Sequence, residues 1–343
     1  MAYVPHDKLI EFCTDVLASA GVARDQARVT ADCMVRADMR GVASHGVIRL
    51  PVYYNRLVKG LIDRAPKGRW VVDKQGTALY DAANGLGHYA GRVAMDRAVQ
   101  KAADHGIAAV GVFNSTHFGM ASYYMLSAVN QGFICLASTN SAPRMAPWGG
   151  RKPVLGTNPL AIGAPSNLPF PLILDMATSV VALGKLVVAA SEGRPVPLGW
   201  GLDKDGNETT DPKEILSGSL SPMSGPKGSG LSLMLDVLCG VLTGAAFGIG
   251  LGSMMNYNTL EKSGHFFLVI DPESFRGLDA FKADLDQLVE MVRSSGTETD
   301  RVYLPGEIEA EREADALVRG VHLEESLIAE LNELARNAGC DQL

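Results

Sequence analysis

The sequence has few cysteines for its length, and they are spread along the chain. Its 343 residues include five cysteines, none in a C-x-x-C pair: Cys13, Cys33, Cys135, Cys239 and Cys340. An odd number of scattered thiols argues against a disulfide framework, and it does not supply the clustered ligands of a zinc site. We therefore predict reduced cysteines in a cytoplasmic protein without a metal centre.

The chain also lacks an excess of positive charge and an uninterrupted apolar run. Its 31 Lys and Arg against 38 Asp and Glu give a net charge of -7, so nucleic acid is not an expected partner, because its binding needs a basic surface. The longest apolar stretch, 230–255, is interrupted by Asp236 and six glycines. We predict a buried core helix over about 227–243 and no membrane span. Residues 1–10 lack the apolar segment of a secretory signal.

Common phosphate-binding loops are missing as well. No G-x-x-x-x-G-K-[ST] segment is present, and residues 85–91 are spaced G-x-G-x-x-x-G, unlike a dinucleotide fingerprint. The apolar segment 107–113 that follows has no carboxylate to bind a ribose. We interpret 85–91 as a helix-capping turn. Residues 203–207 imitate the start of a calcium loop, but Gly206 stands fourth where an EF-hand needs glycine sixth, so we predict a hairpin turn.

Hydrophobic periodicity predicts helical ends and alternating strands and helices between them. The expected helices cover 9–17, 25–40, 50–58, 89–104, 120–130, 227–243, 278–293, 307–319 and 324–337. The expected strands cover 70–73, 78–81, 107–113, 133–138, 172–175 and 265–270, with a short extended segment at 302–304. This pattern indicates an α/β protein, and its length suits one large domain or two to three closely packed ones.

Ser44 and His45 are the first candidates for catalytic chemistry. They lie in a polar loop between two predicted helices, with Arg49 and Tyr53 four and eight residues beyond His45. If a helix begins near Gly46, Arg49 and Tyr53 share a face that points back to the loop. A guanidinium fork suits a carboxylate, and a histidine suits proton transfer between carbonyl and alcohol. The alternative is a helix-capping serine beside a surface histidine.

Three further candidates occupy element ends. His117 follows the strand at 107–113, where α/β enzymes place their sites, although loop packing is the alternative. Asp175 ends the strand at 172–175, where it could orient a histidine or cap the next helix. Lys227 precedes a long apolar helix within the segment SGPKG, and a lysine at a helix N-terminus beside glycines fits a phosphate or carboxylate cradle, with a plain loop lysine as the alternative.

With these motifs in place, the chain resembles the malate/L-lactate dehydrogenase type 2 family. Relatives in that family include ureidoglycolate dehydrogenase, sulfolactate dehydrogenase, 2,3-diketogulonate reductase and the Δ1-piperideine-2-carboxylate reductases. The segments that carry the resemblance run the length of the chain, in matching order and spacing. They are DMRGVASHGVIRLPVYY (38–54), STHFGMASYY (115–124), GFICLASTNSAPRMAPWGG (132–150), LGTNPLAIGAP (155–165), LDMATS (174–179), GPKGSGLSLMLDVLCGVLTGAAFG (225–248) and VYLPGE (302–307).

The resemblance implies an α/β but non-Rossmann nicotinamide-binding fold of the sulfolactate-dehydrogenase-like type. It implies an N-terminal helical part over 1–66 that carries the Ser-His loop. A cofactor- and substrate-binding α/β region follows over 67–306, and C-terminal helices over 307–343 pack on the N-terminal part. Members are generally homodimers with the site near the subunit contact.

The resemblance also assigns site residues. The catalytic set falls on Ser44, His45 and Asp175, with His117 as the other proposed proton acceptor, and substrate-carboxylate contacts fall on Arg49 and Tyr53. Cofactor contacts fall on Ser141, Thr157, Asn158, Asp175, Met176, Ala177, Lys227, Gly306 and Glu307. The stretch 249–264 does not match the family cleanly, and we expect it to help set substrate choice.

The predicted reaction is reversible hydride transfer between a nicotinamide and C2 of a small 2-oxo or 2-hydroxy acid, of the malate, lactate, sulfolactate or ureidoglycolate type. We favour His45 as the proton-exchanging group because Asp175 could fix its tautomer, and His117 would then orient the substrate or polarise its carbonyl. NAD is favoured over NADP because no basic cluster for a 2′-phosphate is recognisable.

Two other functions stay open. One is reduction of cyclic imino acids, whose enzymes tend to carry Gly-His-Lys-Gly where this chain has GPKG at 225–228. The other is a catalytically silent ligand-binding relative. The retained Ser44, His45, Arg49, His117, Asp175 and Lys227 argue against a silent protein.

Overall fold

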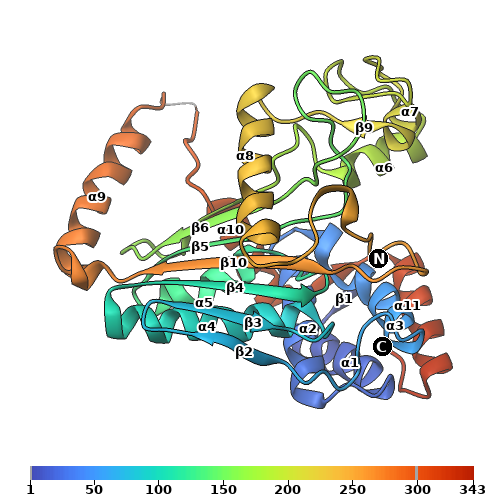
Figure 1. Cartoon of the computed structure of the whole chain (residues 1–343), viewed down its shortest axis with the longest axis horizontal. Helices are drawn as coiled ribbons and strands as arrows, with labels where there is room; N and C mark the ends of the chain where they lie inside the picture. Colours follow the sequence, from blue (N-terminus) through green and yellow to red (C-terminus); the bar gives the residue numbers. More distant parts are fainter. Residues whose placement is uncertain (1, 298–299) are drawn as a thin grey trace.

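A seven-stranded mixed sheet forms the centre of the computed structural model, which describes residues 2–297 and 300–343 (Figure 1). The strands lie in the order β2-β3-β4-β10-β5-β6-β7; their bounds are β2 Arg69–Asp73, β3 Thr77–Asp81, β4 Ile107–Ser115, β5 Ile134–Thr139, β6 Leu160–Ala164, β7 Leu172–Met176 and β10 Ser263–Ile270. All six predicted strands are confirmed. β6 was not predicted, because the sequence LAIGA lacks a run of β-branched residues.

The pairing of the strands differs from that of a Rossmann sheet. β3 and β4 are parallel and are joined by helix α4 (Gly87–His105), whereas the remaining pairs of this sheet are antiparallel. β10 comes late in the chain but lies between β4 and β5 at the centre of the sheet. The sheet therefore has no doubly wound parallel core, as the mismatched glycine motif predicted.

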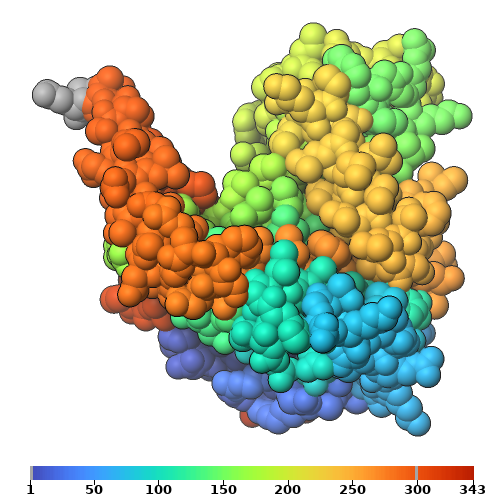
Figure 2. Space-filling view, turned by 60° about the vertical axis from the view of Figure 1, so that its left-hand side comes forward, coloured from blue at the N-terminus to red at the C-terminus, as the bar shows by residue number. Residues whose placement is uncertain are grey.

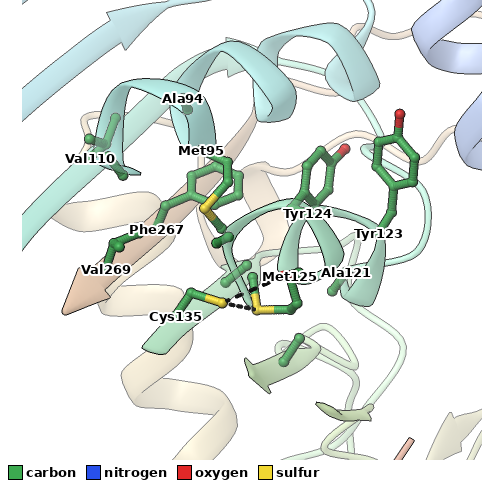
Figure 3. Close-up of a cluster of buried hydrophobic side chains, with 14 of the residues drawn as sticks. Ala94, Met95, Val110, Ala121, Tyr123, Tyr124, Met125, Cys135, Phe267 and Val269 are labelled. Carbon is green, nitrogen blue, oxygen red and sulfur yellow. Dashed lines mark hydrogen bonds between the residues drawn. The ribbon is translucent and has the colours of Figure 1, made fainter. Parts of the chain in front are cut away.

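Helices α4 and α5 (Ser122–Asn130) cover one face of this sheet. Small alanines along α4 let it approach the strands closely, while aromatic and sulfur-containing side chains fill the remaining space (Figure 3). Phe267 of β10 is fully buried among them, and Cys135 of β5 lies against Met125 of α5. This core fixes the end of β4, from which His117 follows.

The two ends of the chain fold together beside the sheet. Five helices and one strand pair share a second buried core (Figure 1). They are α1 His6–Ser19, α2 Arg24–Met39, α3 Leu50–Val58, α10 Glu307–Arg319 and α11 Glu325–Ala338, with β1 Ala2–Val4 antiparallel to β11 Val321–Leu323. The predicted helices in these regions are confirmed.

A smaller lobe between β7 and β10 has its own core, which the sequence did not reveal. Its elements are α6 Leu183–Ser191, β8 Gly201–Leu202, α7 Pro212–Ser217 and β9 Ser219–Leu220. Met145, Leu186 and Leu220 are among its buried residues. The turn predicted at 203–207 follows β8, and Asp203 accepts hydrogen bonds there from the backbone of Asp205 and Asn207.

Helix α8 (Pro226–Asp236) continues into a π-helical turn over Val237–Val241. Ser232, Leu235 and Cys239 are buried, but apolar side chains on the other side of the helix face solvent. Figure 2 shows this segment, in gold, on the surface of the molecule. They are Leu233, Met234, Val241 and Leu242, each more than half exposed. The prediction of a buried core helix is therefore wrong for this face. Within the described residues, no helix has the length and hydropathy needed to cross a membrane.

The remaining long helix, α9 (Leu278–Ser294), extends away from the sheet at the left of Figure 1. It confirms the helix predicted over 278–293. The segment 302–304 is a loop, which leads into α10.

Candidate active site

A tight loop after α2 presents Ser44 and His45. It consists of two consecutive 3₁₀ turns. Asp38 supports it from α2, since its Oδ2 accepts a hydrogen bond of 2.8 Å from the Val47 N–H. Gly46 lies so close to this carboxylate that a Cβ would overlap it. Helix α3 begins at residue 50, as the predicted helix over 50–58 does, and the residues between Gly46 and Leu50 form the second 3₁₀ turn.

Ser44 connects the predicted histidine to the predicted carboxylate-binding group. Its Oγ lies 2.9 Å from His45 Nδ1, and its carbonyl oxygen accepts a hydrogen bond of 2.7 Å from Arg49 Nε. Arg49 Nε is thereby fixed, and the outer nitrogens can bind an anion, since Nη1 contacts only the weak acceptor Sδ of Met255, at 3.8 Å. The alternative of a helix-capping serine does not apply, because Ser44 caps no helix within the described chain.

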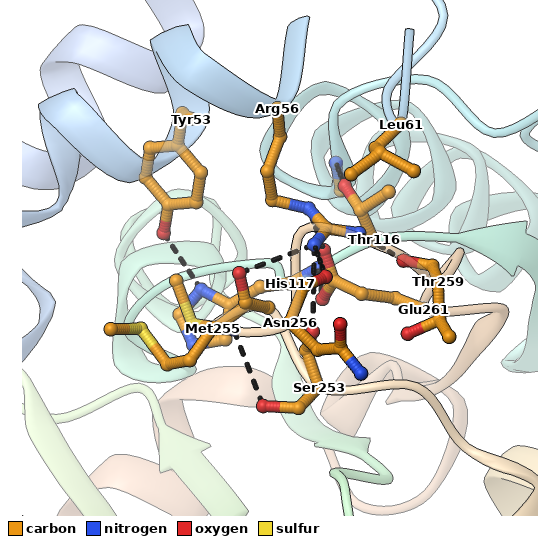
Figure 4. Close-up of polar contacts among 12 residues, drawn as sticks. Tyr53, Arg56, Leu61, Thr116, His117, Ser253, Met255, Asn256, Thr259 and Glu261 are labelled. Atoms are coloured by element: carbon orange, nitrogen blue, oxygen red, sulfur yellow. Dashed lines mark hydrogen bonds and ion pairs between the residues drawn. The ribbon is translucent and has the colours of Figure 1, made fainter. Parts of the chain in front are cut away.

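His117 lies beside His45 although 72 residues separate them in the chain. Their rings are stacked, with centroids 5.4 Å apart. The hydroxyl of buried Tyr53 lies 2.7 Å from His117 Nδ1, and the Gly119 N–H donates to the same nitrogen at 3.3 Å (Figure 4). Because a backbone N–H can only donate, His117 Nδ1 is an acceptor, and the neutral ring carries its proton on Nε2.

The start of α4 explains the glycines of the 85–91 segment. A Cβ on Gly87 would overlap the Thr116 and His117 carbonyls, and the Gly87 N–H donates to Thr116 Oγ1 at 3.0 Å. These glycines therefore allow α4 to pack directly under the His117 loop. The segment 85–91 therefore forms the start of a helix, as predicted, and its glycines are explained by packing without a phosphate-binding loop.

Two buried histidines lie behind the site. His88 is fully buried, packs edge-on against Tyr53 at 4.9 Å, and has no hydrogen-bond partner on either ring nitrogen in the described part of the chain. His265 is also fully buried, and its nitrogens lie 2.7 Å from Thr139 Oγ1 and 2.8 Å from Ser115 Oγ. His45 and His117 keep partial solvent access, so a substrate can reach them.

The surroundings of both reachable histidines favour the neutral ring. Dense protein around His45 lowers its pKa to about 4, and the nearby charge of Arg49 adds to this effect. The pKa of His117 is lowered well below its ordinary value by burial, and then by His45. A neutral imidazole at neutral pH is a base that can take a proton from an alcohol.

Asp175 has a different partner from the one expected. Its Oδ2 accepts a hydrogen bond of 2.7 Å from the Ser122 N–H at the start of α5, and no bond joins it to His45 among the described residues. Burial raises the pKa of Asp175, which the bond from Ser122 opposes. Asp175 thus accepts from the start of the earlier helix α5, and it does not cap the next helix, α6, whose N-cap residue is Ala182. The argument that Asp175 fixes the His45 tautomer does not hold in this structure.

Several of the predicted cofactor residues meet at one turn beside α8. Ser141 Oγ accepts from the Thr157 N–H at 3.1 Å, and Asn158 Oδ1 accepts from the Ser141 N–H at 3.0 Å. Asn158 Nδ2 in turn donates to the carbonyl of Ser232 on α8 at 3.0 Å. Asn158 is fully buried, so it shapes the turn, while Ser141 and Thr157 are partly exposed beside it.

The ends of two helices hold the other predicted cofactor residues. Lys227 is exposed in the first turn of α8, where its charge and the helix dipole both favour an anion. Glu307 is buried at the start of α10, where it pairs with Arg293 and Arg301 and accepts from the Leu304 N–H. Because its carboxylate already has these partners within the protein, Glu307 is not free to bind a cofactor directly.

Near that start, a Cβ on Gly306 would come within 2.8 Å of the Pro171 carbonyl, next to β7. Met176 and Ala177, at the end of β7, are partly exposed. The donor set of exposed hydroxyls, backbone groups and one lysine at a helix N-terminus fits the phosphates and amide of a dinucleotide.

The sequence did not reveal two buried charged residues of the site, Arg56 and Glu261. They form an ion pair of 3.2 Å, and Glu261 accepts a hydrogen bond of 2.9 Å from the His117 N–H (Figure 4). One signal in the sequence could have indicated Arg56: it is an arginine three residues after Tyr53, on the apolar side of the predicted helix 50–58. Glu261 lies in the stretch 249–264, for which no motif pointed to a role.

The mixed sheet, the helical part formed by both chain ends and the reachable histidine pair define an α/β enzyme outside the Rossmann class. The family model for malate/L-lactate dehydrogenase matches residues 4–332. The chain is 40% identical to a malate dehydrogenase of Pyrococcus horikoshii, over 99% of this chain and 96% of the relative. It is 35% identical to an NAD(+)-dependent ureidoglycolate dehydrogenase of Escherichia coli, over 93% and 92%.

Solved structures agree with these sequence matches. The sulfolactate dehydrogenase of Methanocaldococcus jannaschii superposes with a TM-score of 0.93 at 36% identity, covering 99% of this chain and 98% of the other. The chain belongs to the malate/L-lactate dehydrogenase family. The predicted resemblance, the non-Rossmann α/β fold and the assignment as a nicotinamide-dependent dehydrogenase of small 2-hydroxy acids are confirmed.

Proposed function

We propose that Arg49, His45 and His117 carry out reversible hydride transfer at C2 of a small 2-hydroxy acid. The observation that supports this most directly is the stacked His45–His117 pair, open to solvent, with the Arg49 guanidinium tied to Ser44 beside it. A carboxylate on Arg49 places C2 of the substrate next to the imidazoles. The hydroxyl of Tyr53 lies against His117 Nδ1 and holds this ring. We propose that Tyr53 also borders the carboxylate site.

The two histidines take different roles in this proposal. His45 donates its Nδ1–H to Ser44 Oγ, which leaves Nε2 free to accept the proton of the substrate hydroxyl during oxidation. His117 presents an Nε2–H that donates a hydrogen bond to the same oxygen and polarises the carbonyl during reduction. Burial is the main cause of the lowered His45 pKa and the Arg49 charge the second. A substrate carboxylate on Arg49 offsets the second cause, so protonated His45 forms more readily when a 2-oxo acid is bound.

We propose that Lys227, Ser141, Thr157, Met176 and Ala177 hold the cofactor. Asn158 and Gly306 act by shaping the backbone around it, and Asp175 borders it from β7. Glu307 supports these cofactor-binding residues through its ion pairs with Arg293 and Arg301, and it does not contact the cofactor itself. When bound, the nicotinamide supplies or accepts the hydride. NAD is the proposed form, although a relative from Chromohalobacter salexigens is named as NADP(+)-dependent.

The substrates named for the relatives define the range that we propose for this chain. They are malate, sulfolactate and ureidoglycolate. A second candidate is a cyclic imino acid, since a Δ1-piperideine-2-carboxylate reductase from Pseudomonas syringae superposes with a TM-score of 0.90 at 31% identity. The first range is favoured because the sequence GPKG stands at 225–228.

We also propose a cytoplasmic homodimer. The exposed apolar side chains of α8 and its π-helical turn form a surface that a second copy would cover. The shared core of the chain ends supports a division into 1–66 with 307–343, which form a helical part, and 67–306, which forms the cofactor- and substrate-binding region.

A substrate screen tests the function. Oxidation of NADH and of NADPH is followed at 340 nm with pyruvate, oxaloacetate, sulfopyruvate and cyclic imines, and reduction of NAD and of NADP is followed with ureidoglycolate-type 2-hydroxy acids. We expect turnover with a 2-oxo acid and a higher kcat/KM with NADH. Turnover with cyclic imines alone would support the second candidate, and no absorbance change with any compound would support a silent relative.

A further inference from the structure

The segment 253–259 crosses the open side of the site and is held there by one arginine. Arg56 is fully buried, and its Nη1 donates to the carbonyls of Asn256 at 2.8 Å, Met254 at 3.2 Å and Ser253 at 3.4 Å (Figure 4). Its Nη2 donates to the Thr259 carbonyl at 3.0 Å. A guanidinium with this many main-chain acceptors is committed to the segment and is not free to bind a substrate anion.

Glu261 connects that arginine to the active site. One carboxylate oxygen pairs with Arg56 Nε at 3.2 Å, and the other accepts the His117 N–H at 2.9 Å. Both side chains are almost completely buried, where a lone charge would be costly and a charge pair compensates. The backbone of His117 and the segment 253–259 are therefore fixed by the same pair.

Met255 is the residue of this segment that reaches the substrate side. Its Sδ lies 3.8 Å from Arg49 Nη1, yet the residue is 53% exposed, so it lies at the edge of the open site. With a carboxylate on Arg49 and C2 at the histidines, the remaining substituent of C2 shares its space with the Met255 side chain. A thioether on a flexible apolar stem gives this space an adaptable wall.

We infer that Arg56 and Glu261 are positioning residues that clamp the segment 253–259 to His117, and that Met255 determines which C2 substituents the enzyme accepts. The inference rests on the proposed function for the role of Met255, while the clamp itself can be measured without a substrate. None of the three residues takes part in the proton or hydride transfer.

The first experiment removes the clamp with the double variant Arg56→Met/Glu261→Gln. A neutral pair of similar size avoids an unpaired buried charge, and such replacements are commonly tolerated by the fold. Arg64→Met is the matched control, because Arg64 also donates to two main-chain carbonyls, of Leu57 and Val58, at the far end of α3. Hydrogen–deuterium exchange over 250–262 should accelerate about tenfold or more in the double variant alone.

The second readout of the same variants is kinetic. In the double variant KM for the 2-oxo acid should rise about tenfold, with a smaller fall in kcat and an unchanged Kd for NADH by fluorescence titration. A purely structural role would lower kcat and weaken the binding of substrate and NADH together, without this split. Unchanged exchange over 250–262 would overturn the clamp, whatever the activity of the enzyme.

The last experiment tests Met255 with two 2-oxo acids that the wild type reduces and that differ only in the group on C3. Met255→Ala should shift their kcat/KM ratio about fivefold to tenfold toward the larger acid. Leu260→Ala is the control, since Leu260 is an exposed apolar residue of the same stretch. An unchanged ratio in Met255→Ala would overturn the selectivity role. A wild-type enzyme that is inactive on all 2-oxo acids would count against the proposed function only, provided that hydrogen–deuterium exchange is still accelerated in the double variant.

Discussion

The two histidines of the site differ in the partner of Nδ1, and this difference separates their roles. His45 faces a serine hydroxyl, which can donate or accept. His117 faces the Gly119 N–H, which only donates, and the Tyr53 hydroxyl. The first arrangement permits exchange of a proton at Nε2, and the second keeps a proton there as a hydrogen-bond donor.

Glutamine substitutions distinguish these roles, because an amide can donate a hydrogen bond but cannot exchange a proton. His45→Gln should lower kcat by about 10²–10⁴-fold, the usual contribution of a general acid–base. His117→Gln should cost about tenfold or less, and His117→Ala more. Steady-state kinetics with NADH titrations as the binding control provide the measurement. The reverse order of the two glutamine variants would assign the proton to His117.

The depressed pKa of His45 predicts an unusual pH profile. Oxidation of the hydroxy acid needs the unprotonated imidazole, so kcat/KM should be flat from pH 8 to 6 and should fall only as the pH approaches about 4. Since the charge of Arg49 contributes to the lowering, Arg49→Gln should move the inflection upward. The profile is measured with NAD at constant ionic strength. An inflection between pH 6 and 7 in the wild type would contradict this assignment.

The sequence could predict which site residues lie close together only where these residues belong to one short motif. Ser44, His45 and Arg49 lie within six positions, so their proximity follows from the loop itself. Arg56 and Glu261 are 205 positions apart, and their pairing depends on where the segment before β10 crosses the site. No pattern in a single sequence records such a crossing.

Among the elements, α5 shows how one carboxylate can be misassigned. Asp175 ends β7 as predicted, but α5 lies beside that strand and offers the Ser122 N–H at its first turn. An unpaired N–H at a helix start attracts a carboxylate, and the helix dipole strengthens the contact. A distant helix terminus therefore competes with His45 for the same side chain.

This competition predicts different outcomes for two substitutions of Asp175. Asp175→Asn keeps an oxygen acceptor for the Ser122 N–H, so the thermal midpoint should stay close to that of the wild type. Asp175→Ala removes it and should cost about 1 kcal/mol, the typical value of a helix cap. Differential scanning calorimetry measures both. If Asp175→Asn instead lowers kcat as much as His45→Gln and shifts the pH profile, Asp175 acts through His45 after all.

The elements themselves followed the sequence more closely than their arrangement did. Strands rich in β-branched and aromatic residues, such as 265–270, were predicted within two residues of their ends. The central place of β10 was not predictable, because it depends on which strand edges are free after β4 and β5 have formed. The prediction that α8 is buried failed for a similar reason. Its composition shows that the helix is apolar, but it does not show which other elements pack against each of its faces.

At the scale of the whole molecule, the apolar face of α8 and its π-helical turn is the largest departure from the predicted burial. Leu233 and Leu242 are 52% and 62% exposed, and Phe247 and Ile249, a few residues further along the chain, are 56% and 81% exposed. Contiguous apolar surface of this kind marks an interface in stable oligomers. The same helix carries Lys227 in its first turn and contacts the Ser141–Asn158 turn through Ser232, so a partner on this face would also stabilise the cofactor side of the site.

The double substitution Leu233→Asp/Leu242→Asp should therefore shift the protein from dimer to monomer and raise KM for NADH, because the loss of the partner frees α8. Light scattering coupled to gel filtration measures the mass, at concentrations from well below to well above the dissociation constant of the wild type. Val318→Asp is the matched control, since Val318 is an apolar residue of α10 that is 87% exposed and lies outside this face. Two outcomes would contradict the proposed dimer interface: a wild-type protein that is monomeric at every concentration, or a double variant that is still dimeric. In either case the apolar face of α8 would have to bind something other than a second copy of the chain.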